Sequence, residues 1–191
     1  MNKKQPENTE KTRNIYMEAF CALYKKKPIE KISIQELTNK AGYNRSTFYQ
    51  YFRDIYDFRD YLENYALEQF QKYTAEINYD DDFELLLLNL LVRYYEEHYV
   101  FCSALLGKYG IDHFASKIKK NAIPKILEKF KIPNNNFAPR FVLEFHLSGI
   151  VAAVAYWYRN KKNIPTDEIK KMLHGIYFEG SLRYFLKTQS E

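Results

Sequence analysis

The sequence predicts an all-α protein of about nine helices, with a three-helix domain at residues 1–54 and a helical bundle at residues 55–191. Apolar residues recur at three- and four-residue intervals along most of the 191 residues, which is the period of an amphipathic helix. Stretches in which apolar and polar residues alternate, as they do in strands, are almost absent. Serine, aspartate, glycine and proline occur at helix starts and ends, and divide the pattern into separate helices.

The first helix is expected from Asn8 or Thr9 to about Lys26, and Pro28 marks its end. Its apolar face consists of Ile15, Ala19, Phe20 and Leu23. This face is expected to pack on the two short helices that follow, which completes a three-helix core.

Residues 33–52 are expected to form two short helices joined by a tight turn. Ser33 is a good N-cap, and Glu36 three residues later completes the pattern of a capping box. Gly42 stands where a helix ends in the left-handed conformation, which glycine adopts without strain. Asn44 is then the N-cap of a second helix, expected from Arg45 to Phe52.

The second of these helices is expected to have one buried and one exposed face. Phe48 and Phe52 are four residues apart and form the apolar side. Their burial leaves Arg45, Ser46 and Tyr49 together on the outward side. A helix-turn-helix of this length is the unit whose second helix enters the DNA major groove.

Residues from about Thr9 to Phe58 resemble the DNA-binding region of the TetR family of bacterial transcriptional regulators. The matching segments are Ile32-Ser33-Ile34-x-x-Leu37, Ala41-Gly42-Tyr43-Asn44 and Ser46-Thr47-Phe48-Tyr49-x-Tyr51-Phe52. The resemblance implies a homodimer that binds a pseudo-palindromic double-stranded DNA operator, usually as a repressor. The DNA-contacting residues that it implies, with Arg13 of the first helix near the sugar-phosphate backbone, are Ser33, Lys40, Tyr43, Asn44, Arg45, Ser46, Thr47, Tyr49, Tyr51 and Arg53.

The chain departs from the family pattern three residues after Phe52. The family commonly has a phosphate-contacting lysine there, and this chain has Ile55. Arg53 lies two residues earlier and is the candidate replacement for that cation.

The rest of the chain is expected to form further helices. They cover residues 55–77, residues 83–106 after an acidic start at Asp80-Asp81-Asp82, residues 111–130 with a kink or a split at Pro124, residues 137–160, and residues 166–187. Gly107 and Gly110 break the pattern between the second and third of these, and Pro133-Asn134-Asn135-Asn136 is a loop.

The resemblance implies two roles for this second domain. One is an enclosed pocket for a small apolar or aromatic effector, whose candidate lining is Phe70, Phe83, Leu87, Tyr94, His98, Phe101, Phe114, Phe141 and Phe145. The other is dimerisation through the last two helices, with the candidate contacts Gly149, Ala152, Ala153, Tyr156, Ile176 and Gly180. Aromatic residues at helical spacing are also typical of an ordinary core.

The distribution of charge favours a nucleic-acid partner for the first domain. Residues 1–53 carry 11 basic and 5 acidic residues, residues 54–107 carry 3 and 12, and residues 108–191 carry 15 and 7. A basic end beside an acidic middle suits a protein that presents one face to phosphate. The lysines of the last third are interpreted as solvated surface.

Other chemistries lack their sequence signals. The four histidines occur without metal-binding spacing, and no nucleophile or phosphate-loop motif is present, so the chain is expected to be neither an enzyme nor a holder of a metal or cofactor. Cys21 and Cys102 are isolated, and are expected to be reduced and buried.

No apolar run approaches the length needed to cross a bilayer and no signal sequence is recognised, so a cytoplasmic protein without a membrane partner is expected. The alternative function is a helical protein-interaction adaptor, which retains the helix-turn-helix as a packing unit but lacks specific DNA binding.

Overall fold

The computed structural model describes the backbone of residues 6–74, 83–160 and 164–180. The side chains of residues 6–8, 73–74, 83–89 and 177–179 lie outside the description, as do the Asp80-Asp81-Asp82 start and the predicted helix end at residues 181–187. Within the described residues the chain is all-helical, with nine α-helices and one short 3-10 helix. Their bounds are α1 Pro6–Tyr24, η1 Ile29–Lys31, α2 Ile34–Ala41, α3 Arg45–Tyr49, α4 Ile55–Thr74, α5 Phe83–Glu97, α6 Tyr99–Leu105, α7 Ile111–Lys129, α8 Phe137–Arg159 and α9 Thr166–Glu179.

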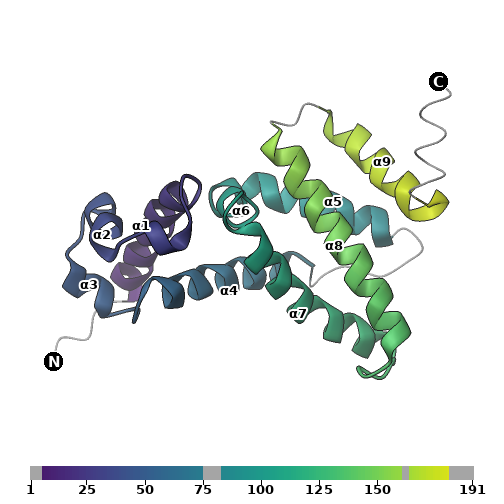
Figure 1. Cartoon of the computed structure of the whole chain (residues 1–191), viewed down its shortest axis with the longest axis horizontal. Helices are drawn as coiled ribbons and strands as arrows, with labels where there is room; N and C mark the ends of the chain where they lie inside the picture. The colour runs from purple at the N-terminus through teal and green to yellow at the C-terminus, as the bar shows by residue number, and fades with distance from the viewer. Residues whose placement is uncertain (1–5, 75–82, 161–163, 181–191) are drawn as a thin grey trace.

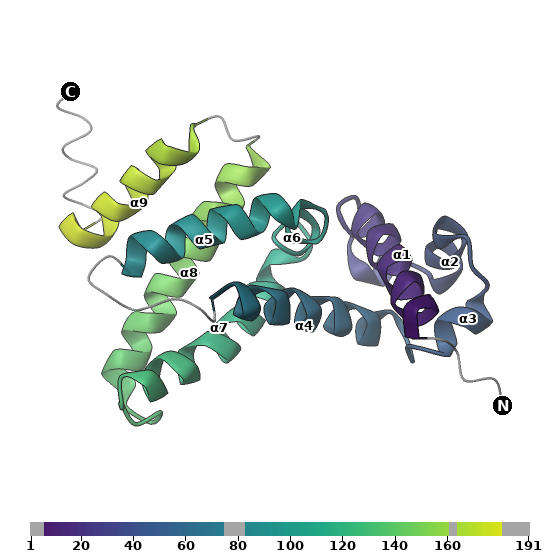
Figure 2. The same ribbon diagram turned by 180° about the vertical axis from the view of Figure 1, so that it is seen from behind.

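The helices form two groups joined by α4. Helices α1, α2 and α3 lie together at one end of the molecule, and α4 runs from α3 toward the other helices (Figure 1). Seen from behind, α5, α8 and α9 lie at the opposite end, while α6 lies between them and α1 (Figure 2). The helix-turn-helix therefore stands clear of α8 and α9.

Two helix predictions were wrong in detail, and a third is narrowed. The predicted helix at 83–106 is two helices, because the backbone of His98 (φ −112°, ψ 32°) leaves the helical range. Of the kink or split predicted at Pro124, the split is excluded, because α7 runs as one helix from Ile111 to Lys129. The helix that begins at Arg45 ends at Tyr49, one turn early.

Two hydrophobic cores divide the molecule. The first contains buried residues of α1, η1, α2, α3 and α4, together with Ala104 and Leu105 of α6 and Phe114 of α7. The second joins α5, α6, α8 and α9 around Val154, Trp157 and Leu173. The first core thus continues past the predicted boundary between residues 54 and 55, and it includes α6 and the start of α7.

Helix α8 is long and apolar enough to cross a membrane by length and composition alone, with a mean hydropathy of 1.4 in its most apolar window. The expectation that no apolar run approaches that length was wrong. The apolar residues of α8 outweigh the charged Arg140 and Glu144, so the mean hydropathy stays high. Only 11% of this window is buried within the chain. The same composition arises in a helix that packs on another protein chain, so this finding is weak evidence for a membrane.

Candidate DNA-binding surface

Helix α2 is bounded by the two residues that the sequence predicts for its ends. The Ser33 hydroxyl accepts a hydrogen bond from the backbone N–H of Glu36 at 3.1 Å and begins α2. Gly42 ends the helix with φ +73°, where an L side chain would be strained. These local signals fix the angle at which the chain enters α3.

Helix α3 is a single turn followed by a second, irregular turn. Asn44 is the N-cap residue of α3, as the sequence predicts, and its backbone carbonyl accepts from Thr47 N–H at 3.0 Å, but its side chain makes no capping hydrogen bond. Tyr51 and Phe52 donate their N–H groups to the carbonyl of Phe48 at 2.9 and 3.1 Å. This hydrogen-bonded turn brings Phe52 under α3 although the regular helix has ended.

An aromatic cluster anchors the inner side of α3. The rings of Phe48 and Phe52 are buried, as the sequence predicts, and their centroids lie 6.0 and 4.6 Å from that of Phe58 in α4. The Phe58 ring also lies 5.3 Å from Phe20 of α1. Edge-to-face pairs of this kind add to the stabilisation from burial, so α3 is held on a rigid base.

The outer side of α3 carries polar groups in contact with solvent. Arg45 and Ser46 are exposed, and Tyr49 is 50% exposed. The Arg45 guanidinium lies over the Tyr49 ring, 5.9 Å from its centroid, and donates to the Tyr49 hydroxyl at 3.4 Å. An exposed guanidinium that leads a short helix suits bidentate recognition of guanine in the major groove.

The other residues predicted to contact DNA differ in their solvent exposure and in the contacts that they already make. Lys40 and Asn44 are exposed, and Ser33 is exposed although its hydroxyl already caps α2. The half-buried residues Tyr43, Thr47 and Tyr51 border the first core. Tyr43 packs 5.4 Å from the Tyr16 ring, so only the edge of its side chain is presented outward.

The start of α4 accounts for the departure from the family pattern. Ile55 is buried in the first core and faces away from the candidate DNA surface. The Arg53 side chain is 85% exposed, and its Nη2 lies 3.4 Å from Asp57 Oδ1. An exposed ion pair of this kind contributes little to the stability of the fold, so the Arg53 guanidinium can exchange Asp57 for a phosphate.

Two features near this surface escaped the sequence reasoning. Asp54 caps α4, because its Oδ1 accepts from Tyr56 N–H at 2.9 Å and from Asp57 N–H at 2.8 Å. An aspartate just before a helical pattern is a readable N-cap signal. The other feature is the position of Arg13, whose guanidinium lies between the rings of Tyr51 and Tyr61, 5.8 and 5.4 Å from their centroids.

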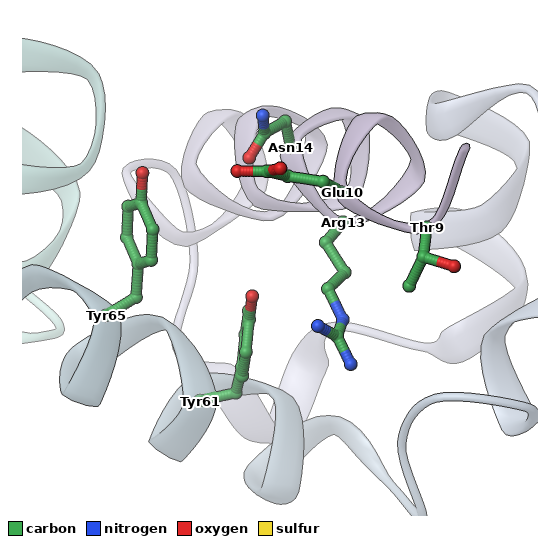
Figure 3. A pocket seen from close by; sticks show the side chains of 6 residues that line it. All are labelled: Thr9, Glu10, Arg13, Asn14, Tyr61 and Tyr65. Atoms are coloured by element: carbon green, nitrogen blue, oxygen red, sulfur yellow. The ribbon is translucent and has the colours of Figure 1, made fainter. Parts of the chain in front are cut away.

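Arg13 also lines an open cleft of about 300 Å³ between α1 and α4. Figure 3 shows the side chains that line it, which are Thr9, Glu10, Arg13, Asn14, Tyr61 and Tyr65. Burial raises the pKa of the Tyr61 hydroxyl, and the neighbouring Arg13 opposes that shift. The guanidinium therefore contacts aromatic rings, and its contact with the DNA sugar-phosphate backbone stays a prediction.

The predicted effector residues do not form one group. Four of them meet where α4, α5 and α6 pack together: the Tyr94 ring lies 5.2 Å from Phe70 and 4.5 Å from His98, and His98 lies 5.2 Å from Phe101. The Tyr94 hydroxyl donates to the carbonyl of Ala66 at 2.6 Å, so its polar end is already satisfied. Since these rings touch one another, a ligand has to displace them to enter.

The remaining effector residues lie elsewhere. Phe114 is buried in the first core. Phe141 and Phe145 are 61% and 68% exposed on α8, so they line no enclosed pocket among the described residues. The side chains of Phe83 and Leu87 lie outside the described residues.

The predicted dimer residues mostly share the exposed face of α8. Gly149, Ala152 and Tyr156 are exposed, and they continue the line of Phe141 and Phe145 at intervals of three and four residues. Ile176 of α9 and Gly180 are also exposed. Ala153, at the edge of this face, is half-buried and packs against the second core.

The fold and the surface together define a class. An N-terminal helix-turn-helix with an exposed second helix, followed by a larger helical part, is the architecture of helix-turn-helix transcriptional regulators. Residues 84–178, about half of the chain, match the family model described as the transcriptional regulator C-terminal region of the TetR family. The chain belongs to the TetR family of transcriptional regulators, whose members are generally not enzymes. No curated protein matches the chain.

Proposed function

We propose that this protein is a cytoplasmic repressor that binds a pseudo-palindromic operator as a homodimer and is released by a small apolar or aromatic effector. The observation that carries DNA binding is the division of α3, where Phe48 is buried and Arg45 and Tyr49 are exposed. The excess of basic residues in residues 1–53 supports it, because phosphate contacts supply most of the affinity for duplex DNA.

The experiment selects bound fragments from random duplex DNA and then compares variants on the selected site. A site of two inverted halves is expected. Arg45→Ala is expected to weaken binding by about 1–3 kcal/mol and to relax specificity at one base pair. Lys26→Ala is the matched control, because it removes one exposed positive charge of the same domain that lies outside the helix-turn-helix, just after α1. A loss that is equal for all sequences would remove the base-reading role from Arg45.

The proposed dimer rests on the uncovered apolar face of α8. Phe137, Phe141 and Phe145 are all exposed and lie four residues apart, and Gly149, Ala152 and Tyr156 continue the same face. Exposed patches of this kind mark interaction surfaces, and a second copy of the chain presents the same apolar helix in return. This surface also supplies the two-fold axis that an inverted repeat requires.

The proposed effector site is the contact of Phe70, Tyr94, His98 and Phe101. These aromatic rings come from α4, α5, α6 and the residue between α5 and α6, and α4 leads directly to the helix-turn-helix. A ligand that separates the rings would bind one arrangement of α4 better than another, which is the condition for any effector to change DNA affinity.

The adaptor function remains the second candidate, and the observation that favours it is the burial of Ile55 where a phosphate-contacting cation is usual. Binding to bulk duplex DNA over a salt series separates the two. A DNA-binding protein loses affinity steeply as salt rises, and Arg53→Ala should lower that salt slope by about one. A chain with no affinity at low salt would be an adaptor.

A further inference from the structure

Helix α4 carries a fully buried carboxylate at the place where it meets α7. The Glu63 side chain is 0% exposed. Its oxygens lie 2.8 and 3.1 Å from His113 Nδ1 and 3.2 Å from Lys117 Nζ, both on α7, and 3.9 Å from Arg59 Nε on its own helix. A buried charge is tolerated only with such partners, because no water remains to solvate it.

The same face of α7 and the turn before it make two further contacts, one with α1 and one with α4. Tyr109, His113 and Lys117 are four residues apart, so they lie along one side of this helix and the turn before it. The Tyr24 hydroxyl of α1 donates to the carbonyl of Tyr109 at 2.9 Å, and Lys117 Nζ donates to the carbonyl of Asp60 at 3.1 Å. The start of α7 is thus hydrogen-bonded to both α1 and α4.

The turn before α7 is rigid for a steric reason. A Cβ at Gly110 would lie 2.6 Å from the carbonyl oxygen of Leu105 and 2.7 Å from that of Ala104. Contacts this short are not tolerated, so only glycine fits at this position. The turn therefore holds the contacting face of α7 at one angle to α6.

The charges of this network balance without a metal ion. The ligand atoms of Asp60, Glu63 and His113 lie within 4.8 Å of one another, a spacing that a metal ion could bridge. However, Lys117 lies 3.8 Å from Asp60 and 3.2 Å from Glu63, and Arg59 lies 3.3 Å from Asp60. Two positive side chains thus already face the two carboxylates, and the network is an ionic connection between helices.

We propose that Glu63 is a positioning residue for DNA binding, which fixes the helix-turn-helix domain at one angle to the helices that carry the dimer face. The proposal rests on the proposed function. In a dimer the two recognition helices must be about 34 Å apart to enter successive major grooves. The angle between α4 and α7 sets that separation, and a movement of α7 is transmitted to α4 as long as the Glu63 contacts persist.

The experiment measures the angle and the affinity separately. Spin labels at Lys31→Cys in η1 and Lys125→Cys in α7, both exposed positions, report their distance distribution in double electron–electron resonance. The labelled chain is diluted with unlabelled chain, and the buried Cys21 and Cys102 do not compete for label. Glu63→Gln keeps the shape of the side chain and removes its charge. It is expected to broaden the distribution and to weaken binding to the selected operator about 5- to 150-fold.

The matched control is Glu97→Gln, which removes the same charge from an exposed pair with Arg93 inside α5, and it should change neither reading. If Glu63→Gln does not fold, Lys117→Met and His113→Ala test the same contacts from the α7 side, where the side chains are part-exposed. Glu63→Gln combined with Lys117→Met should weaken binding by less than the product of the single effects, because both substitutions remove the same contact between Glu63 and Lys117.

An unchanged distance distribution, or a broadened one with unchanged operator affinity, would overturn the role of Glu63. A wild-type chain without affinity for DNA would overturn the proposed function, and the distance measurement would still decide whether Glu63 fixes the angle.

Discussion

The two cores of this protein differ in how completely the chain covers them. Around Phe58 the first core closes on every side with residues of the same chain, so that Tyr16, Phe20 and Phe48 are all fully buried. In α8 the buried residues, Ile150 to Tyr158, all lie in the C-terminal half of the helix, and none lies between Phe137 and Gly149. Among the residues that the structure describes, the first core is complete within one chain, whereas the face of α8 that carries Phe141 and Phe145 is left uncovered.

This difference fits the tasks that we propose for the two parts. A reading helix must be held in one position to recognise bases, and a sealed aromatic core provides that rigidity. A dimerising or ligand-responsive part must exchange one set of contacts for another. Its apolar surface is therefore left for a second molecule to cover.

The largest expected effect comes from opening the sealed core. Phe58→Ala removes a ring that contacts Phe20, Phe48 and Phe52, and it should lower the free energy of unfolding by about 3–5 kcal/mol. Urea unfolding followed by circular dichroism measures the loss. Tyr49→Ala, at an exposed position in the same domain, should change stability by about 0.5 kcal/mol or less. Equal losses in both variants would mean that the first core is not sealed.

A smaller effect is expected from a substitution on the uncovered face of α8. It should change the stability of the dimer and leave the folding of the chain unchanged. Phe145→Ser should weaken the dimer by about 1.5–3 kcal/mol, the free energy of burying one such side chain. Sedimentation velocity over a concentration series measures the shift toward monomer. Phe130→Ser is the control, since Phe130 is similarly exposed but follows α7 and lies off the α8 face. A dimer that persists unchanged in Phe145→Ser would place the interface elsewhere.

A third test separates stability from DNA contact within the first part. Ser33→Ala removes the N-cap of α2 and should cost about 1 kcal/mol of unfolding free energy. Ser33→Asp retains a capping oxygen, so its stability should stay near that of the wild type, but its negative charge should weaken DNA binding. Urea titrations of the two variants measure the free energy of unfolding, and DNA titrations measure the affinity for the operator. If Ser33→Asp binds DNA like the wild type, Ser33 does not lie near phosphate.

The smallest expected effect is a difference in thiol reactivity between Cys21 in the first core and Cys102 in the second. Burial raises the pKa of Cys21 to about 12 and also raises the pKa of Cys102, so both thiols stay protonated and unreactive at pH 8. Because these folded-state pKa values are raised, the two thiols leave stability unchanged with pH below about 9, and they lower it above that, where only the unfolded chain ionises. Reaction with a thiol reagent at pH 8 should be slow and should modify Cys102 before Cys21, because the core around Cys102 is less completely covered. The reverse order would contradict the comparison.

Much of the first part could be predicted from the sequence, because its signals are local. Ser33 and Gly42 bound α2 whatever lies around them, since one accepts a hydrogen bond from the following turn and the other adopts a positive φ. The spacing of Phe48 and Phe52 places both on one side of the chain. The exposed face of Arg45, Ser46 and Tyr49 follows from that burial.

Other features depend on residues far apart in the sequence. The half-exposed ring of Tyr43 depends on Tyr16, and the inward position of Ile55 depends on the core that α1 supplies. A glutamate in the middle of a helix suggests solvated surface, and only the approach of α7 makes Glu63 a buried ionic contact.

The helical period of α8 puts Phe141, Phe145 and Tyr156 on a shared side of one helix, although the family resemblance assigns the two phenylalanines to an effector pocket and Tyr156 to the dimer. The period does not indicate whether that side meets another helix of the same chain, a ligand or a second copy. The sequence by itself determined which segments are helical and several of their ends, such as those at Ser33 and Gly42, because hydrogen bonds and sterics between neighbours act over a few residues. The tertiary structure alone decided which faces are covered, because burial depends on how distant segments fill the same volume.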